Sequence, residues 1–508
     1  MVLPVGHRFV HYIEIQRMSS PDATELNMQA RRALDFFQHQ TALQLDGPFT
    51  IDLCSKWLSR LMQHDTAIKH GVIALATLHE SFMQPSLAGT DERKILALHH
   101  YGKSINGVVQ LNAKAPGSVS ATTLVTCLLY CLIESLQGHF HSAWKHIIAG
   151  IQLLAEVDQG LLSHGNTSAD IPQPLLDLLR RVLVSLGTQA TALQDGPVDP
   201  MAIQHIKNSH RTVNEVFTST EEALAELSHL VNDVLQAMTW VDISDVDVDW
   251  PSEDFVLARE ALESRLSSWA LAFKNLLVTD SNRTTDPRDR SDIALLILRV
   301  NQILCRVIMT CMYTKSQTAF DACLEDFQMI VQITKSIIAI EQQQEQSRPN
   351  SPSNSPPLPA SSRPTFSMML GIIPALFFVC IRCRHQETRR QALQILLENR
   401  RRETCWDSYV VGRAAEKHIM IEEQRMARYW RETQTQGDGP SIRHQPDSEL
   451  ARATSESADS NWTDTTHMPE NMRLDRLDVD FTTEKSAVLS FAQTQSGERY
   501  DMVMEWDD

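Results

Sequence analysis

The sequence predicts an all-α protein, a multi-helical and α-solenoid-like body with a small C-terminal β appendage. Apolar residues recur at steps of three and four along most of the 508 residues, which is the spacing of one helix face. Glycine is scarce, with 18 residues, and a hydrophobic content of 43% is enough for a sizeable core. Beyond residue 471, apolar and polar side chains alternate with a two-residue period, which predicts strands.

The first helices have recognisable start and stop residues. A helical face begins near Asn27 and ends at the turn residues 46–48, Asp-Gly-Pro. Asp65 is the predicted N-cap of a second helix, because a carboxylate at this position accepts hydrogen bonds from the first free backbone N–H groups. A third helix is predicted through residues 97–108.

A strongly apolar helix follows, beginning at Ser118 or Ser120 and ending near Gln137-Gly138. The next helix begins at once, so the two must be antiparallel neighbours, and such hairpins in series build α-solenoid-like bodies. Residues 242–249, in which Asp and Val alternate, are predicted to form a loop or a short extended piece. Further helical periodicity covers 172–188, 210–238, 254–277, 291–313, 318–344, 365–399 and 406–432.

Composition divides the chain into six segments. Two polar stretches cannot bury enough apolar surface to offset the entropy of ordering them, and we expect them to be disordered. The predicted organisation is an N-terminal arm at 1–26, the main helical body at 27–340, a disordered Ser/Pro/Gln linker at 341–364, a helical continuation of the body at 365–432, a disordered acidic segment at 433–470 and a short β-like appendage at 471–508.

Charge and cysteine content limit the function classes. A net charge of −17 excludes a chain held on DNA or on an anionic membrane by its overall field. The nine cysteines are odd in number and lie mostly in apolar helical contexts, which favours a reducing compartment. We expect no signal peptide and no membrane span, since the apolar stretches 124–133 and 366–381 are shorter than the roughly 20 residues a span needs.

The cysteines do not form a recognisable zinc site. Cys127 and Cys131, like Cys380 and Cys383, are isolated pairs in apolar surroundings, whereas a structural zinc site needs four convergent ligands. The six-cysteine pattern of a binuclear zinc cluster is absent from the sequence. We therefore assign no metal-ligating residues.

Catalytic motifs are absent as well. The sequence has no Gly-x-Ser-x-Gly elbow, no phosphate-binding loop, no Gly-x-Gly-x-x-Gly and no His-Glu-x-x-His. We interpret the histidines at 99–100 and 139–146 as surface or helix-capping residues. The acidic run Asp245–Asp249 lacks the glycine and the closing glutamate of a calcium loop. We therefore assign no catalytic residue, no cofactor-binding residue and no cofactor.

Two further patterns have a structural and a functional interpretation. The Leu-x-x-Leu-Leu stretches at 175–179 and 393–397 are predicted core-facing turns, with docking to a partner groove as the alternative. Seven arginines are interpreted as solvated helix faces, with nuclear import or nucleic-acid contact as the alternative. These arginines are Arg382, Arg384, Arg389, Arg390, Arg400, Arg401 and Arg402.

Four stretches in a fixed order carry a family resemblance. They are ALDFFQHQTALQLDGPF (33–49) with IKHGVIALATLHESF (68–82), YGKSINGVVQL (101–111), LLYCLIESLQGHFHSAWKHIIAGIQLL (128–154) and RRQALQILLENRRRETCWDSYVVGRAAEKHIMIEEQ (389–424). Together they resemble the fungal-specific regulatory domain found downstream of Zn2Cys6 DNA-binding clusters. Residues 477–506 are similar to the end of that family's body.

The resemblance implies an all-helical body that regulates transcription in the nucleus, often of a metabolic or secondary-metabolite gene cluster. Because the zinc cluster of that family has no counterpart here, we expect indirect contact with DNA through a DNA-binding transcription factor or co-regulator protein. A homodimer and a heterodimer are both open. The alternative function is a helical scaffold or protein-interaction module with no direct transcriptional role.

The acidic tail has two interpretations. From Thr433 to Asp508 there are 16 Asp or Glu and 6 Lys or Arg, which gives the tail −10 of the total charge. Acidic residues interspersed with apolar ones are typical of activation segments, whose aromatic residues stay available to a partner. The favoured interpretation is instead that the alternation represents strands docked on the helical body, with their charges facing water.

We predict that the purified chain binds no stoichiometric zinc, because no four-ligand set exists in the sequence. Elemental analysis of the purified protein, with a known zinc-cluster protein as positive control, measures this. One or more tightly held zinc ions per chain would contradict the prediction.

Overall fold

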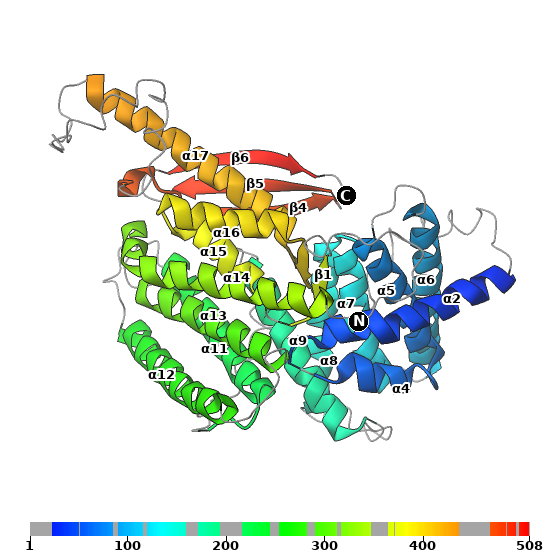
Figure 1. The fold of residues 1–508 in the computed structure, drawn as a ribbon. Coiled ribbons are helices and arrows are strands. Elements are labelled where there is room, and N and C mark those ends of the chain that lie inside the picture. Colours follow the sequence, from blue (N-terminus) through cyan, green and yellow to red (C-terminus); the bar gives the residue numbers. More distant parts are fainter. Residues whose placement is uncertain are drawn as a thin grey trace.

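The computed structural model is an all-α body with a small C-terminal β-sheet, which confirms the predicted fold class (Figure 1). It describes residues 23–49, 51–84, 90–114, 119–158, 171–193, 216–243, 253–281, 290–311, 316–346, 364–369, 371–435, 468–483, 485–493 and 497–506. The α-helices are α2 (Ala23–Phe36), α3 (Ala42–Asp46), α4 (Ser59–Leu61), α5 (Thr66–Met83), α6 (Thr90–Lys114), α7 (Ala121–Leu136), α8 (Phe140–Asp158), α9 (Gln173–Leu193), α11 (Thr220–Ile243), α12 (Glu253–Ser281), α13 (Arg290–Cys311), α14 (Leu324–Gln346), α15 (Ile373–Arg382), α16 (Gln386–Glu398) and α17 (Ser408–Thr435). The strands are β1 (Thr365–Ser367), β2 (Arg401–Glu403), β3 (Trp406–Asp407), β4 (Arg476–Thr483), β5 (Ser486–Gln493) and β6 (Glu498–Glu505).

Local signals placed the first helix ends correctly. The Asp65 carboxylate accepts hydrogen bonds from the backbone N–H groups of Ala67 and Ile68, and therefore caps α5. Ser120 caps α7 in the same way. Gly138 has a φ of 79°, a left-handed conformation that glycine adopts without strain, and it closes the short turn between α7 and α8.

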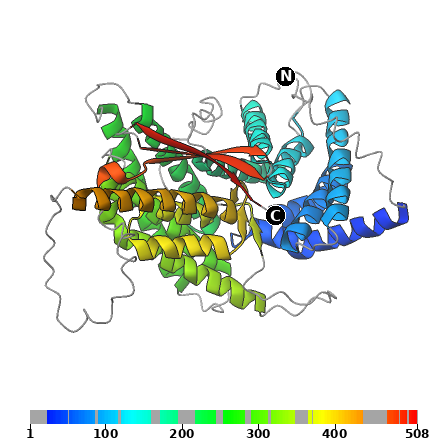
Figure 2. The same ribbon diagram turned by 90° about the horizontal axis from the view of Figure 1, so that it is seen from above.

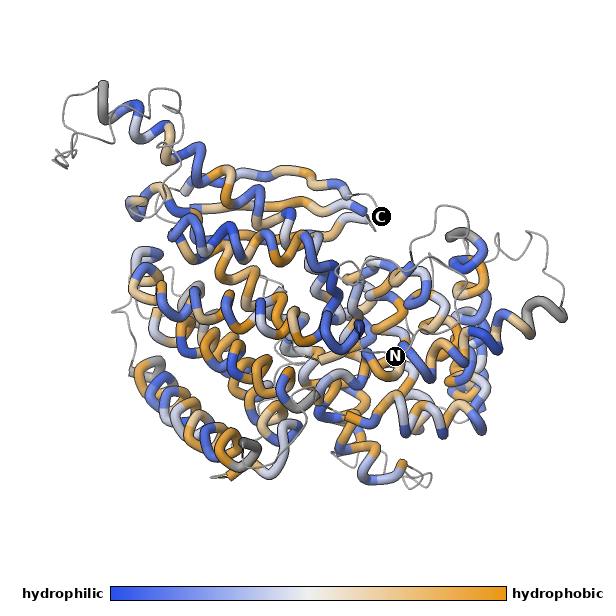
Figure 3. Tube along the Cα trace, in the orientation of Figure 1, coloured by the Kyte–Doolittle hydropathy of each residue, from blue (hydrophilic) through white to orange (hydrophobic). Residues whose placement is uncertain are grey.

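Antiparallel helix pairs follow one another along the chain and share one core. Helices α2–α9 lie on one side of the molecule and α11–α17 on the other, with β1 between them (Figures 1 and 2). Apolar residues concentrate on the inward faces of the helices (Figure 3). A single hydrophobic cluster extends from Ala33 in α2 to Ile419 in α17. The two sides are therefore packed as one body.

Helix α13 lies deep in this body. Among the described residues, Asp292–Cys311 is the one stretch long and apolar enough to cross a membrane by length and composition. In the structure, 72% of its apolar window is buried by neighbouring protein, and Val300 and Ile303 have no solvent exposure. Burial of this kind also characterises the core helix of a globular body.

The C-terminal strands form an antiparallel sheet in the order β4-β5-β6, lying alongside α17 (Figure 2). Val479 pairs with Leu489 and Leu489 with Met502, so these side chains share the inner face. The inner face packs on α17 around Val410 and Ile421. This geometry agrees with the docked-strand interpretation of the tail.

The face of β5 was predicted incorrectly. The two-residue alternation that predicts this strand places Val488 and Ser490 on its inward face, but Ala487, Leu489 and Phe491 are the residues with no exposure. Ser490 lies opposite Asp478 and Asp501 on the outer face. In so short a strand both alternating sets contain apolar residues, so periodicity alone does not select the buried one.

The helix predicted for 365–399 is wrong at its start and in its middle. Residues 365–367 form β1, which pairs in parallel with β2, and β2 pairs in turn with β3. Pro374 lies in the first turn of α15, where its missing N–H costs nothing, so the helix begins only there. A break at 383–385 then separates α15 from α16.

Close packing explains the interruption before α15. The Glu403 carboxylate accepts hydrogen bonds from the backbone N–H groups of Ile372 and Ile373, at 2.9 and 3.1 Å. A Cβ on Gly371 would lie 2.1 Å from Glu403 Oε1, so only glycine allows this approach. Burial raises the pKa of Glu403 to about 7.

Segment boundaries shift where helices continue into predicted linkers. Helix α14 extends to Gln346 and α17 to Thr435, so the first residues of both predicted disordered segments are helical. A short 3₁₀ helix, η7 (Glu470–Met472), begins within the second. Residues 1–22, 347–363 and 436–467 lie outside the described part of the chain, as do 244–250, which contain the acidic run Asp245–Asp249.

We predict that Phe491→Ala lowers the free energy of unfolding by about 3 kcal/mol, because its fully buried ring joins the sheet to α17. Denaturant titration measures the change, and hydrogen exchange should increase first in β4–β6. Val503→Ala is the control on the same sheet, since Val503 is 67% exposed and its loss should be nearly neutral. Equal effects of the two substitutions would contradict this packing.

Candidate functional site

The arginine-rich segment between residues 382 and 402 is largely buried, which corrects the prediction of solvated helix faces. Arg384, Arg389, Arg401 and Arg402 are each less than 9% exposed. The other three are less buried: Arg382 and Arg400 are half-buried, and the Arg390 side chain is 51% exposed. Guanidinium groups held inside the protein are not available as a basic patch for phosphates.

A single carboxylate, that of Glu422 in α17, gathers two of these arginines. Arg384 donates to Glu422 Oε1 and Arg389 donates to Oε2, each at 2.5 Å. The backbone N–H of Leu474, just before β4, also donates to Oε1 at 2.8 Å. We call Arg384, Arg389, Glu422 and Leu474 the Glu422 junction. These contacts connect α16, α17 and the start of the C-terminal sheet at the Glu422 carboxylate.

Further hydrogen bonds hold the two guanidinium groups of the Glu422 junction in place. Arg384 donates to the carbonyl of Leu474 at 3.1 Å, and Arg389 Nε donates to the carbonyl of Cys380 at 2.7 Å. Arg389 Nη2 lies 3.2 Å from Nδ1 of His418. Every member is buried, so the attraction between the guanidinium groups and the carboxylate is screened little by solvent.

Electrostatics at this junction keeps the carboxylate ionised. Burial alone would raise the pKa of Glu422, but the charges of Arg384 and Arg389 hold it well below its usual range. Burial lowers the pKa of Arg384 to about 10 and that of His418 to about 3. His418 is therefore a neutral ring at physiological pH and is not a proton-transfer group there.

A second junction joins the two sides of the body. Arg402 Nε donates to the Asp407 carboxylate at 2.9 Å, while Arg402 Nη1 donates to the carbonyls of Ser135 and Leu136 at the end of α7. Asp407 also accepts the N–H groups of the first turn of α17. Next to it, Trp406 Nε1 donates to the carbonyl of Gln189 in α9 at 2.9 Å. Trp406 thus anchors the start of α17 to the body.

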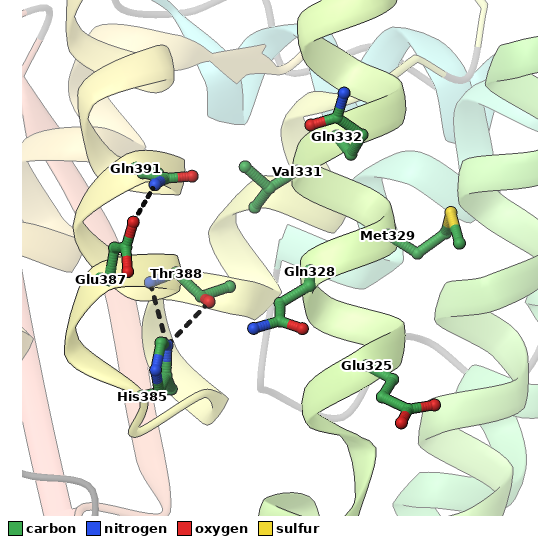
Figure 4. A pocket seen from close by; sticks show the side chains of 9 residues that line it. All are labelled: Glu325, Gln328, Met329, Val331, Gln332, His385, Glu387, Thr388 and Gln391. Atoms are coloured by element: carbon green, nitrogen blue, oxygen red, sulfur yellow. Dashed lines mark hydrogen bonds between the residues drawn. The ribbon is translucent and has the colours of Figure 1, made fainter.

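A groove of about 490 Å³ lies between α14 and α16 (Figure 4). The Gln328 side chain of α14 and the His385–Thr388 end of α16 face each other across it. Its lining is mostly polar, with two carboxylates. The lining residues are Glu325, Gln328, Met329, Val331, Gln332, His385, Glu387, Thr388 and Gln391.

The histidine in this groove is a helix cap and not a catalytic base. Both the backbone N–H and the hydroxyl of Thr388 lie within hydrogen-bond distance of His385 Nδ1, at 3.4 and 2.9 Å. That nitrogen acts as an acceptor at the start of α16, where free N–H groups need partners. The groove can bind polar groups, but it offers no activated nucleophile.

Three of the four cysteines in the two pairs lie in the core, and the fourth, Cys127, is half-buried. Cys131, Cys380 and Cys383 are buried, and burial raises the thiol pKa values of Cys380 and Cys383 to about 12 and 11. Raised pKa values disfavour the thiolate that metals and electrophiles require. Within the described ranges, no group of three or more His, Cys, Asp or Glu could hold a metal ion.

The other sequence candidates also serve packing. Leu175 and Leu179 have no exposure, and Leu396 is 1% exposed, which supports the core-facing interpretation of both leucine motifs. His141 is exposed as predicted, but His100 is buried, and its Nδ1 lies 2.8 Å from that of His70. Burial lowers the pKa of His100 to about 3.

Comparison with known proteins connects this architecture to a named role. Over 469 aligned residues the chain is 23% identical to the aspercryptin biosynthesis cluster-specific transcription regulator atnN of Emericella nidulans, covering 79% of this chain and 74% of that protein. The chain resembles a fungal transcription regulator. The similarity supports a role in transcription regulation and not in catalysis. No family model and no solved structure matches the chain.

We predict that Glu422→Gln lowers the free energy of unfolding by about 3–5 kcal/mol, because it leaves two buried guanidinium groups without a counter-charge. Glu423→Gln is the matched control one residue away, since its partner Arg390 is half-exposed and such a pair contributes under about 1 kcal/mol. Denaturant titration of both variants gives the comparison. Comparable losses would contradict the role assigned to Glu422.

Proposed function

We propose that this protein regulates the transcription of a metabolic or secondary-metabolite gene cluster in the nucleus, acting through contacts with other proteins. The observation that carries the proposal is the similarity to a cluster-specific transcription regulator along 79% of the chain. A regulator of this kind needs a stable body with binding surfaces and has no need of a catalytic centre.

The resemblance motifs support the proposal through their positions. The stretch 389–424 contains Arg389, Arg402, Trp406 and Glu422, which build both buried junctions. The stretch 128–154 supplies the Ser135 and Leu136 carbonyls that Arg402 contacts. The motifs thus specify how the two sides of the body pack, which is the property a regulatory scaffold must keep.

Indirect DNA contact is part of the proposal. Four of the seven arginines that could have formed a basic patch are buried and bound to carboxylates and carbonyls inside the body, and the net charge is −17. Clustered exposed cations are what phosphate recognition requires. A DNA-binding protein partner would supply the sequence reading that this body is not built to perform.

In this proposal, the strands after residue 471 have a structural role, because their aromatic side chains pack against the helical body and against each other. The ring of Phe481 lies 4.4 Å, between centroids, from that of Phe140 in α8, and 6.2 Å from that of Trp506. An activation segment would keep such aromatic groups available to a partner. Their mutual packing favours the structural role of β4–β6.

Deletion of the gene tests the proposal. We expect the transcripts of one contiguous biosynthetic cluster to change together, and a tagged full-length chain to be recovered in the nucleus at the promoters of that cluster by chromatin immunoprecipitation. Removing a zinc-cluster partner should abolish recovery at the promoters while the protein level stays constant.

Two complementation strains make the test specific. Glu423→Gln should restore the transcripts, whereas Glu422→Gln should not, because only the second damages the body. An unchanged transcript profile in the deletion strain, with the tagged chain outside the nucleus, would favour the scaffold function instead.

A further inference from the structure

The outward face of α12 carries large apolar side chains in contact with solvent. Leu257, Leu271 and Val278 are 58%, 62% and 58% exposed. Their spacings of fourteen and seven residues place them on one side of the helix. The opposite side, which includes Trp269, packs into the body. Helix α12 is also the outermost helix of its layer (Figure 1).

Two charged side chains of opposite sign lie on the same outward face. Glu260 and Lys274 are both exposed, and neither has an ion pair or a hydrogen bond with another residue of the described ranges. Elsewhere on the helix, Arg265 is paired with Asp233 of α11 at 2.5 Å. The outward face therefore combines exposed apolar groups with one positive and one negative charge that remain available for an external partner.

The positions of these charges are symmetrical. Glu260 lies seven residues before Ser267 and Lys274 lies seven residues after it. If a second α12 packs antiparallel about a twofold axis at Ser267, Glu260 of each copy lies opposite Lys274 of the other, and two complementary pairs form. A parallel arrangement would instead place like charges opposite each other.

The apolar groups fit the same arrangement. Leu257 lies ten residues before Ser267 and Val278 eleven residues after it, so these two side chains would meet across the axis. Leu271 lies four residues after Ser267 and the exposed Ser264 three residues before it, so the leucine would lie within one residue of the position opposite Ser264, whose small side chain leaves room for it. Each copy thus presents the same patch to the other, as a twofold interface requires.

We infer that the outward face of α12 is a homodimer interface in which a second copy of this chain packs antiparallel, with Glu260 of one copy against Lys274 of the other. Neither the geometry nor its test depends on the proposed transcriptional function. A single helix pair buries less than a standard interface of about 1,600 Å², so the dimer should dissociate in the micromolar range.

Analytical ultracentrifugation of the full chain across the micromolar range tests the inference. The wild type should change from monomer to dimer with concentration. Lys274→Glu places like charges together at two symmetric positions and should weaken the dimer about tenfold. The double variant Glu260→Lys with Lys274→Glu restores opposite charges in the antiparallel arrangement and should return the dissociation constant to the wild-type value.

Leu271→Glu should abolish dimerisation, while Val109→Glu, at a 53% exposed apolar position of α6, should leave it unchanged. Circular dichroism confirms that each variant is folded. A wild-type chain that stays monomeric throughout, or a double variant as weak as Lys274→Glu alone, would overturn the inference.

Discussion

One buried carboxylate holds the C-terminal part of the molecule together. Glu422 accepts hydrogen bonds from two guanidinium groups at 384–389 and from the backbone N–H of Leu474, so it joins two separate parts of the chain to α17. Taking the three ionised groups out of water is costly, so the cluster is poor evidence for stability in itself. Its effect is on arrangement, because any other packing of α16, α17 and the sheet would leave a buried charge uncompensated.

A buried ionic contact also fixes the arrangement of the two sides of the body. Arg402 neutralises the carbonyl end of α7 and the Asp407 carboxylate at the start of α17, so it satisfies two helix ends at once. The fold therefore combines one continuous hydrophobic cluster with a few buried ionic contacts that fix its geometry. Little of this polar chemistry faces solvent, because Arg402, Asp407, Arg389 and Glu422 are all buried.

The sequence was informative wherever the determining interaction was local. The Asp65 cap, the Ser120 cap and the turn at Gly138 depend on neighbours within a few residues, and all three were predicted. In contrast, the formation of strand β1 and the burial of the arginines depend on partners that lie far away along the chain. Charge patterning shows that Arg389 is cationic, but not that Glu422, 33 residues later, will reach it inside the protein.

These distant contacts also determine the order in which the body can close during synthesis. The carbonyls of Ser135 and Gln189 emerge from the ribosome long before Arg402 and Trp406, which lie 267 and 217 residues further on. Loop closure over such separations is slow, and partly folded chains expose their core surfaces meanwhile. The helices up to α9 therefore lack these hydrogen bonds and the packing beside them until the segment around β2 and β3 has been synthesised. The junction that gives the finished protein its geometry therefore leaves core surface of the nascent chain exposed until the segment around β2 and β3 has been synthesised.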